Sequence, residues 1–191
     1  MPFWTADYQG SDEDPKRNFR FVVQITGLPT SAGIPSDIIW YAKEVTKPSF
    51  TVNVAEHAYL NHKFKFPGTV TWNDIDLTVV DPQNPDAAEA LSMLWQASGY
   101  TIPGGPATSG SPDLATVSKG RATTAMGNVI ITQVDANGVG IETWRLKNAF
   151  CKGITYGDSI AYGNDELTTY KLSVVYDFAS ITTPNRTVFP G

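Results

Sequence analysis

Alternation of apolar and polar residues over 169–178, broken only by Val175, constrains the fold of this chain more than any other feature. Every second residue is apolar and would lie on one face of a strand: Tyr170, Leu172, Val174, Tyr176 and Phe178. The residues between them are mostly polar, and a repeat of two is typical of a β-strand with one buried face. The segment therefore predicts a half-buried strand rather than a helix.

The same analysis along the chain predicts a mainly β protein. Gly, Pro and Asn-Gly pairs separate the alternating runs, as hairpin turns require. Residues 55–62 have no clear period and predict a long connection, and Pro67-Gly68 predicts a turn. The apolar parity flips near Asn73-Asp74, which predicts a bulge or tight turn there. The predicted strands lie at 19–25, 38–45, 50–54, 63–66, 70–80, 129–135, 141–148 and 169–178.

One helix is predicted at 85–98. Asn84 suits its N-cap, Pro85 its first turn and Gly99 its end. With about eight strands and this one packed helix, the sequence predicts a β-barrel or β-sandwich. We expect a single domain over 1–191 with three extended appendages: an N-terminal arm at 1–18, a Gly/Pro/Ser/Thr-rich insertion at 99–127 and a C-terminal tail at 182–191.

Composition argues against several classes of function. The net charge is −5 and no cluster of Lys and Arg occurs, whereas free nucleic-acid binding normally needs a basic patch. A single cysteine, Cys151, excludes an intrachain disulfide and a Cys-based zinc site. The sequence from Met1 has no signal-peptide pattern, and no run approaches 18 apolar residues, so we expect no membrane insertion by this chain.

No set of residues predicts catalysis, a cofactor or a metal. His57 and His62 are five apart, with Glu56 as the nearest carboxylate, so exposed loop histidines are favoured over metal ligands. Cys151 has no local nucleophile motif, and no Gly-x-Ser-x-Gly elbow occurs. Asp74, Asp76 and Asp81 lack a calcium-loop pattern. We therefore expect a non-enzymatic protein.

Three groups of residues in each half of the chain resemble the tail tube proteins of contractile-tailed (myovirus-type) bacteriophages. The first half contributes the runs 42–50, 61–68 and 72–78, followed by Asp81 before a helix. The second half contributes 144–150, 162–167 and 172–177. The order and spacing of these runs agree over roughly 19–178.

The resemblance implies hexameric rings, joined through their inner strands, that stack into a tail tube for genome ejection. Its implied partners are other copies of the chain, a sheath protein, a baseplate or tube initiator, a tape measure protein and a tail terminator. Double-stranded DNA would pass through an acidic lumen without specific binding. The implied location is the tail of a virion assembled in the cytoplasm of a host bacterium.

Contacts between subunits are expected at apolar and aromatic residues of the appendages and of the 55–62 connection, which the family places between rings. These candidates are Phe3, Trp4, Tyr8, His57, Tyr59, Leu60, His62 and Phe189. Alternatives within the superfamily are the tube of a type VI secretion system or R-type bacteriocin, or a tube-initiating baseplate protein. An alternative of a different class is a β-sandwich carbohydrate-binding module with exposed Trp and Tyr.

Overall fold

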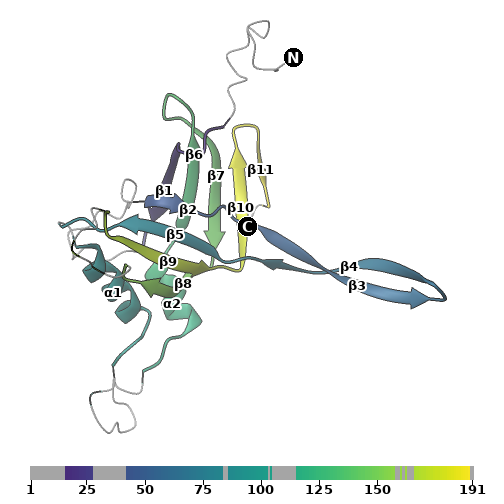
Figure 1. Ribbon diagram of the computed structural model, residues 1–191, viewed down its shortest axis with the longest axis horizontal. Helices are drawn as coiled ribbons and strands as arrows, with labels where there is room; N and C mark the ends of the chain where they lie inside the picture. Colours follow the sequence, from purple (N-terminus) through teal and green to yellow (C-terminus); the bar gives the residue numbers. More distant parts are fainter. Residues whose placement is uncertain are drawn as a thin grey trace, which may run out of the picture.

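The computed structural model describes residues 16–27, 42–83, 86–102, 104, 115–157, 160, 162 and 166–189. These residues form three sheets and two helices (Figure 1). The mainly β class is confirmed. The predicted numbers of strands and helices were too low, because the described residues hold eleven strands and a second helix.

Two sheets form the body of the molecule. The first has the order β1 (Phe21–Ile25), β6 (Val129–Val134), β7 (Gly140–Lys147), β10 (Phe178–Thr183) and β11 (Arg186–Val188). The second has the order β2 (Ala42–Val45), β5 (Ile75–Val80), β9 (Thr169–Val175) and β8 (Phe150–Thr155). Figure 1 shows the strands of one sheet running across those of the other.

The core lies between these two sheets. Side chains from both sheets are buried there in one cluster. The first sheet contributes Val23, Ile131 and Leu146, and the second contributes Leu77 and Leu172. The alternating burial of β5, β6 and β9 confirms the period of two on which their prediction rested. Burial of these side chains is the main stabilising contribution to the body.

The chain passes between the sheets at two adjacent corners. Asn148, with φ of 54°, connects β7 to β8, and Asp177 connects β9 to β10. The Asn148 amide donates to Asp177 at 2.7 Å, and the Lys119 ammonium lies 2.8 Å from the same carboxylate. Phe178 therefore begins the next strand instead of ending the predicted one, and the predicted tail at 182–191 begins within a β10–β11 hairpin.

Helix α1 (Ala87–Ala97) packs on the core through Leu91 and Leu94. Its N-cap is Asp86 and not Asn84: the Asp86 carboxylate accepts from the backbone N–H groups of Ala88 and Glu89, at 2.9 and 3.2 Å. Gly99, with φ of 99°, follows the helix end as predicted.

Helix α2 (Lys119–Met126) lies within the segment expected to be an extended insertion. It buries Ala122, Ala125 and Met126 beside α1 and β8. Gly127 then passes against Gly27: a Cβ on Gly127 would lie 2.7 Å from the Gly27 nitrogen. This close approach fixes the end of α2 against β1.

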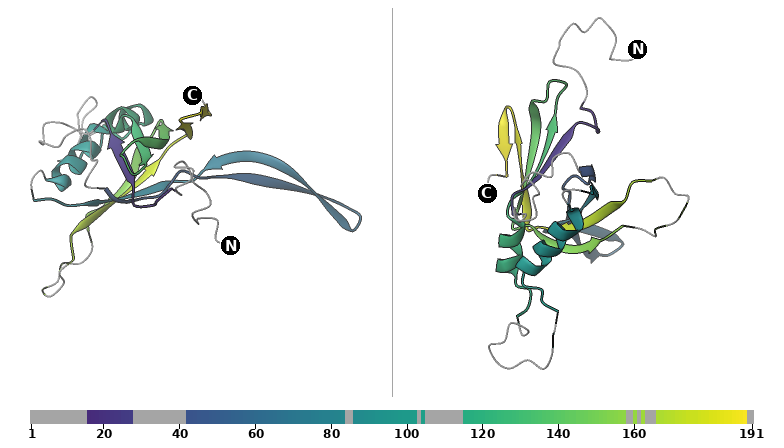
Figure 2. Two further views of the ribbon diagram at one scale, coloured as in Figure 1. Left: turned by 90° about the horizontal axis from the view of Figure 1, so that it is seen from above. Right: turned by 90° about the vertical axis from the view of Figure 1, so that its left-hand side faces the viewer.

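Among the described residues, strands β3 (Phe50–Tyr59) and β4 (His62–Trp72) pair with each other and with no other strand, and they extend away from the body (Figures 1 and 2). We call this hairpin, residues 50–72, the arm; it is distinct from the predicted N-terminal arm at 1–18. The predictions of a connection at 55–62 and a turn at Pro67-Gly68 were wrong, since both stretches belong to the arm. The predicted break at Asn73-Asp74 is confirmed, because it separates β4 from β5.

Candidate assembly surface

The arm is fixed to the body at its base. The Asn73 backbone N–H donates to the Ser49 carbonyl at 2.9 Å, and the Asn73 amide donates to the Ser49 hydroxyl at 3.0 Å. These two bonds close the hairpin where β3 begins and β4 ends. The chain enters the arm from β2 and leaves it into β5, so both connections lead to the same sheet.

The arm exposes an unusual amount of apolar surface. Every residue of β3 and β4 is exposed except Trp72, which is half-buried. The exposed fractions of its large apolar side chains run from 43% for Val52 to 88% for Leu60. Exposed apolar surface of this extent is typical of an interaction site. The residues are Phe50, Val52, Val54, Tyr59, Leu60, Phe64, Phe66 and Val70.

Two predicted contact residues have a backbone conformation that their side chains disfavour. Leu60, the first residue of the two-residue turn between Tyr59 and His62, has φ of 54°, and Phe189 has φ of 55°. Glycine or asparagine normally occupies such positions. At Leu60, which is 88% exposed, this conformation costs about 1–2 kcal/mol and is offset by little burial in the single chain. Such strain is typical of functional positions.

Trp72 connects the base of the arm to the body. Its ring centroid lies 5.1 Å from that of Phe50, 5.9 Å from that of Tyr176 and 6.3 Å from that of Phe189. Phe50, Val70, Trp72, Phe178, Ala179 and Phe189 line an apolar groove of about 220 Å³. The apolar surface of the arm thus continues onto β10 and the C-terminal hairpin.

The structure brings some predicted contact residues together and separates others. His57, Tyr59 and His62 share one face near the tip, with Leu60 in the turn. Phe189 lies at the base instead. Phe3, Trp4 and Tyr8 lie outside the described residues. The apolar residues along β3 and β4 were not among the predicted contact residues. Their occurrence in two consecutive predicted strands could have indicated an exposed apolar hairpin.

A buried carboxylate reinforces the segment that leads into the arm. Glu142 on β7 accepts from Lys16, from Lys47 at 2.9 Å and from the Trp144 indole at 2.6 Å. Burial raises the pKa of Glu142, but these hydrogen bonds outweigh it and lower the pKa to about 2. Lys47 lies between β2 and β3, so the cluster connects the approach to the arm with the first sheet.

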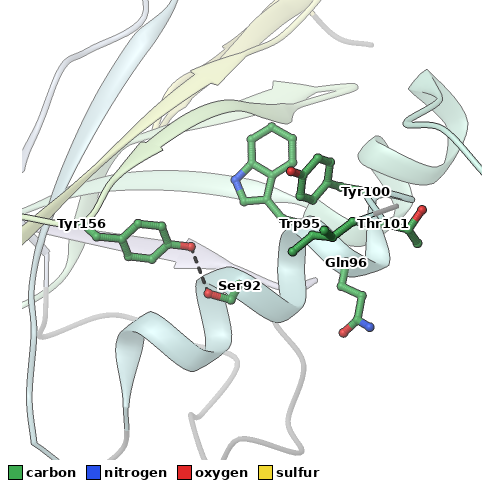
Figure 3. Close-up of a pocket in the computed structure, with 7 residues that line it drawn as sticks. Ser92, Trp95, Gln96, Tyr100, Thr101 and Tyr156 are labelled. Carbon is green, nitrogen blue, oxygen red and sulfur yellow. Dashed lines mark hydrogen bonds between the residues drawn. The ribbon is translucent and has the colours of Figure 1, made fainter. Parts of the chain in front are cut away.

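An open cleft of about 770 Å³ lies beside α1 (Figure 3). The Ser92 hydroxyl lies 3.0 Å from the Tyr156 hydroxyl, a contact that Figure 3 marks with a dashed line. The Trp95 ring centroid lies 6.3 Å from that of Tyr100. Gln96, Thr101 and Ile102 complete the lining. The described residues of this lining include no carboxylate, imidazole, amine or thiol for acid–base or nucleophilic chemistry.

The thiol of Cys151 is poorly suited to be a nucleophile. The side chain is buried, burial raises its pKa to about 11, and the thiol donates to the Gly153 carbonyl at 3.4 Å. The thiolate is the reactive form. Among the described residues, no group of three or more His, Cys, Asp and Glu could hold a metal ion. None of the helices in this part of the chain has the length and apolar character to span a membrane.

The sequence matches no family model and no curated protein. Solved structures are similar to it. A chain of a PVC sheath–tube complex, from an extracellular contractile injection system in its extended state, aligns with a TM-score of 0.64 and 16% identity. That alignment covers 94% of this chain and 99% of the other.

Two further structures agree. A chain of the anti-feeding prophage cap, which terminates the tube, aligns with a TM-score of 0.61 and 15% identity over 96% of this chain and 99% of that one. An Hcp protein aligns with a TM-score of 0.50 and 15% identity over 88% and 97%. The first two of these structures are described as parts of tube assemblies, a sheath–tube complex and a tube-terminating cap. The chain therefore has the Hcp-like tube fold of contractile injection systems, in agreement with the resemblance found in its sequence.

Proposed function

We propose that this chain is the repeating subunit of the inner tube of a contractile injection machine. Copies form hexameric rings, the rings stack into a tube, and a sheath surrounds it. The arm carries the proposal, because it presents apolar surface that nothing in the described part of the single chain covers. Similarity to a sheath–tube complex over nearly the full length of both chains supports it.

We further propose that the machine is a contractile phage tail. The sequence resemblance over roughly 19–178 supports this assignment, and so does the net charge of −5, since an acidic conduit repels DNA phosphates and keeps the genome mobile. The partners are then the sheath protein, the baseplate or tube initiator, the tape measure protein and the terminator. The tail would be assembled in the host bacterial cytoplasm.

A headless injection system is the second candidate. The similar structures from the PVC and anti-feeding prophage particles favour it. Particles released by the producing cells would separate the two candidates. An antibody against this chain should label tails attached to heads with nuclease-protected DNA if the machine is a phage. Labelled headless tubes without protected DNA would support the second candidate instead.

Electron microscopy of the purified chain tests the proposal of a tube subunit. We expect sixfold rings or hollow tubes in negative stain, and a matching heavy species in sedimentation velocity. The control is Phe66→Ser, which removes an exposed aromatic ring from the arm and leaves the buried core unchanged. Persistent monomers of the wild-type chain at high concentration would contradict the proposal.

A further inference from the structure

The apolar row of the arm changes face partway along the hairpin. Near the base, Phe50 lies opposite Trp72 and Val52 opposite Val70. These four side chains share one face, since alternate residues of a strand point the same way. The other face of the base is polar, and there the Asn53 amide donates to the Thr69 hydroxyl at 3.1 Å.

Nearer the tip the arrangement is reversed. The pairs Ala55–Phe66, His57–Phe64 and Tyr59–His62 occupy the face that is polar at the base. The face that is apolar at the base is charged here. On it, Glu56 lies 3.3 Å from Lys63 and 3.8 Å from Lys65.

A bulge in β4 keeps the two strands matched through this change. Val52 pairs with Val70 and Val54 with Pro67, so β4 contains one residue more than β3 in this interval. Gly68 lies in the bulge, where a Cβ would stand 2.9 Å from the Asn53 carbonyl oxygen. Only glycine fits there without a shift of the backbone.

Twist of the hairpin explains why a change of face is useful. Figure 1 and the left view of Figure 2 show β3 and β4 crossing over each other along the arm. Strands of a two-stranded ribbon are rotated by up to roughly 35° across about 4.8 Å, or about 25° for each residue of length. At that rate the five residues from Val52 to His57 correspond to a rotation of about 125°. A row kept on one face would rotate away by that angle, whereas a change of face adds half a turn and leaves the two halves within about 55° of each other.

We propose that the Gly68 bulge aligns the two apolar halves on one side of the arm, and that a second copy of this chain covers that side as one continuous interface. This inference rests on the proposed function. The strands contain 10 and 11 residues, and about half of them face that side, so the arm supplies a part of the 20–30 or so residues on each side of a standard interface.

Charge favours a second copy as the occupant. The arm contains Glu56, Lys63 and Lys65 as its formally charged residues, which gives it a net charge of +1. The rest of the chain therefore has a net charge of −6 within the total of −5. The arm of one copy is attracted to the body of another, which speeds association and favours this pairing.

The matched pair Gly68→Ala and Gly120→Ala tests the role of the bulge. Gly120, on the exposed face of α2, has no atom within 4 Å of the place that a Cβ would occupy, so the same added methyl is harmless there. We expect Gly68→Ala to weaken self-association at least about tenfold by sedimentation velocity, with an unchanged melting profile of the body, while Gly120→Ala assembles like the wild type. If the wild type assembles and the two variants self-associate equally well, this inference would be overturned while the proposed function would stand.

Charged substitutions at the two ends of the arm test the continuity of the interface. Val52→Asp acts near the base and Phe64→Asp near the tip, both at exposed positions where folding of the body is unaffected. If the base and the tip of the arm belong to one interface, assembly of both variants should halt at the same state, whether monomer or ring. A Phe64→Asp variant that still forms rings, beside a monomeric Val52→Asp variant, would show two separate interfaces and refute the inference. A wild type that never assembles would refute this inference together with the proposed function.

Discussion

The Lys47 ammonium lies 2.9 Å from the Glu142 carboxylate and connects the segment before the arm to strand β7. The Glu142 side chain is only 9% exposed, whereas that of Lys47 is 49% exposed. The carboxylate is also bound by Lys16 and Trp144, so its charge is well compensated. This contact gives the base of the arm a second attachment besides the Ser49–Asn73 bonds.

Glu142→Gln should destabilise the body by about 1–2 kcal/mol at pH 7, an amount reduced by the partial exposure of both lysines. The folded-state pKa of Glu142 is lowered from 4.5 to about 2, so its contribution is fully present above the unfolded value. It is lost as the pH falls from about 4.5 towards 2. Urea unfolding of both proteins at several pH values measures this difference.

The control for this prediction is Glu56→Gln on the arm, whose ion pairs are exposed and should be worth less than about 0.5 kcal/mol. A stability difference for Glu142→Gln that stays constant between pH 7 and pH 3 would contradict the assigned role of the carboxylate.

Leu60→Gly should stabilise the arm and weaken assembly. Glycine removes the strain at φ of 54°, worth about 1–2 kcal/mol, and costs about 0.5–1 kcal/mol in chain entropy. We expect a net gain of about 0.5–1 kcal/mol in denaturation of the monomer, with fewer tubes in electron microscopy. Val139→Gly, in an exposed turn without positive φ, is the matched control and should only destabilise. Unchanged tube formation by Leu60→Gly would argue against a contact at the tip.

Cys151 should be almost unreactive in the folded protein. Its pKa of about 11 leaves little thiolate at pH 8, and the side chain is buried. With a thiol-specific chromogenic disulfide reagent we expect labelling at least about 100-fold slower than in guanidinium. Equal rates in the two conditions would show that the thiol is accessible and would reopen a catalytic interpretation.

Leu94→Ala should be among the most damaging substitutions in α1. The side chain is 1% exposed and belongs to the core cluster. Loss of a buried leucine side chain costs about 2–5 kcal/mol, measured as the shift in the denaturation midpoint. Gln96→Ala, on the exposed face of the same helix, should change stability by less than about 0.5 kcal/mol. Similar losses for both would mean that the helix is not docked on the core.

The body could be predicted from sequence because burial imposes a period on its strands. β5, β6 and β9 alternate along their whole length, since one side of each meets the core and the other does not. The turn at Asn137-Gly138 was also predictable, and Gly138 has φ of 80°. In these segments the local pattern and the tertiary environment agree.

The arm and α2 could not be predicted in the same way. In the arm, the change of face at the bulge breaks the period, and no core selects one face over the other. In α2, Gly120 and neighbouring threonines have low helix propensity, so the helix depends on packing of Ala122 and Met126 against the body. The candidate contact residues at 57–62 were predicted through the family resemblance, whereas their position at the tip of a hairpin was not predicted.

The arm is a sheet of only two strands, so each strand has one edge with no neighbour among the described residues. Isolated hairpins are marginally stable in water, whereas the strands of the body are held on both sides or packed against the core. Amide protons of the arm should therefore exchange with solvent through local opening long before those of β5 or β9. Each arm would gain its rigidity only on joining the assembly, so a growing tube would order its own building blocks as it lengthens.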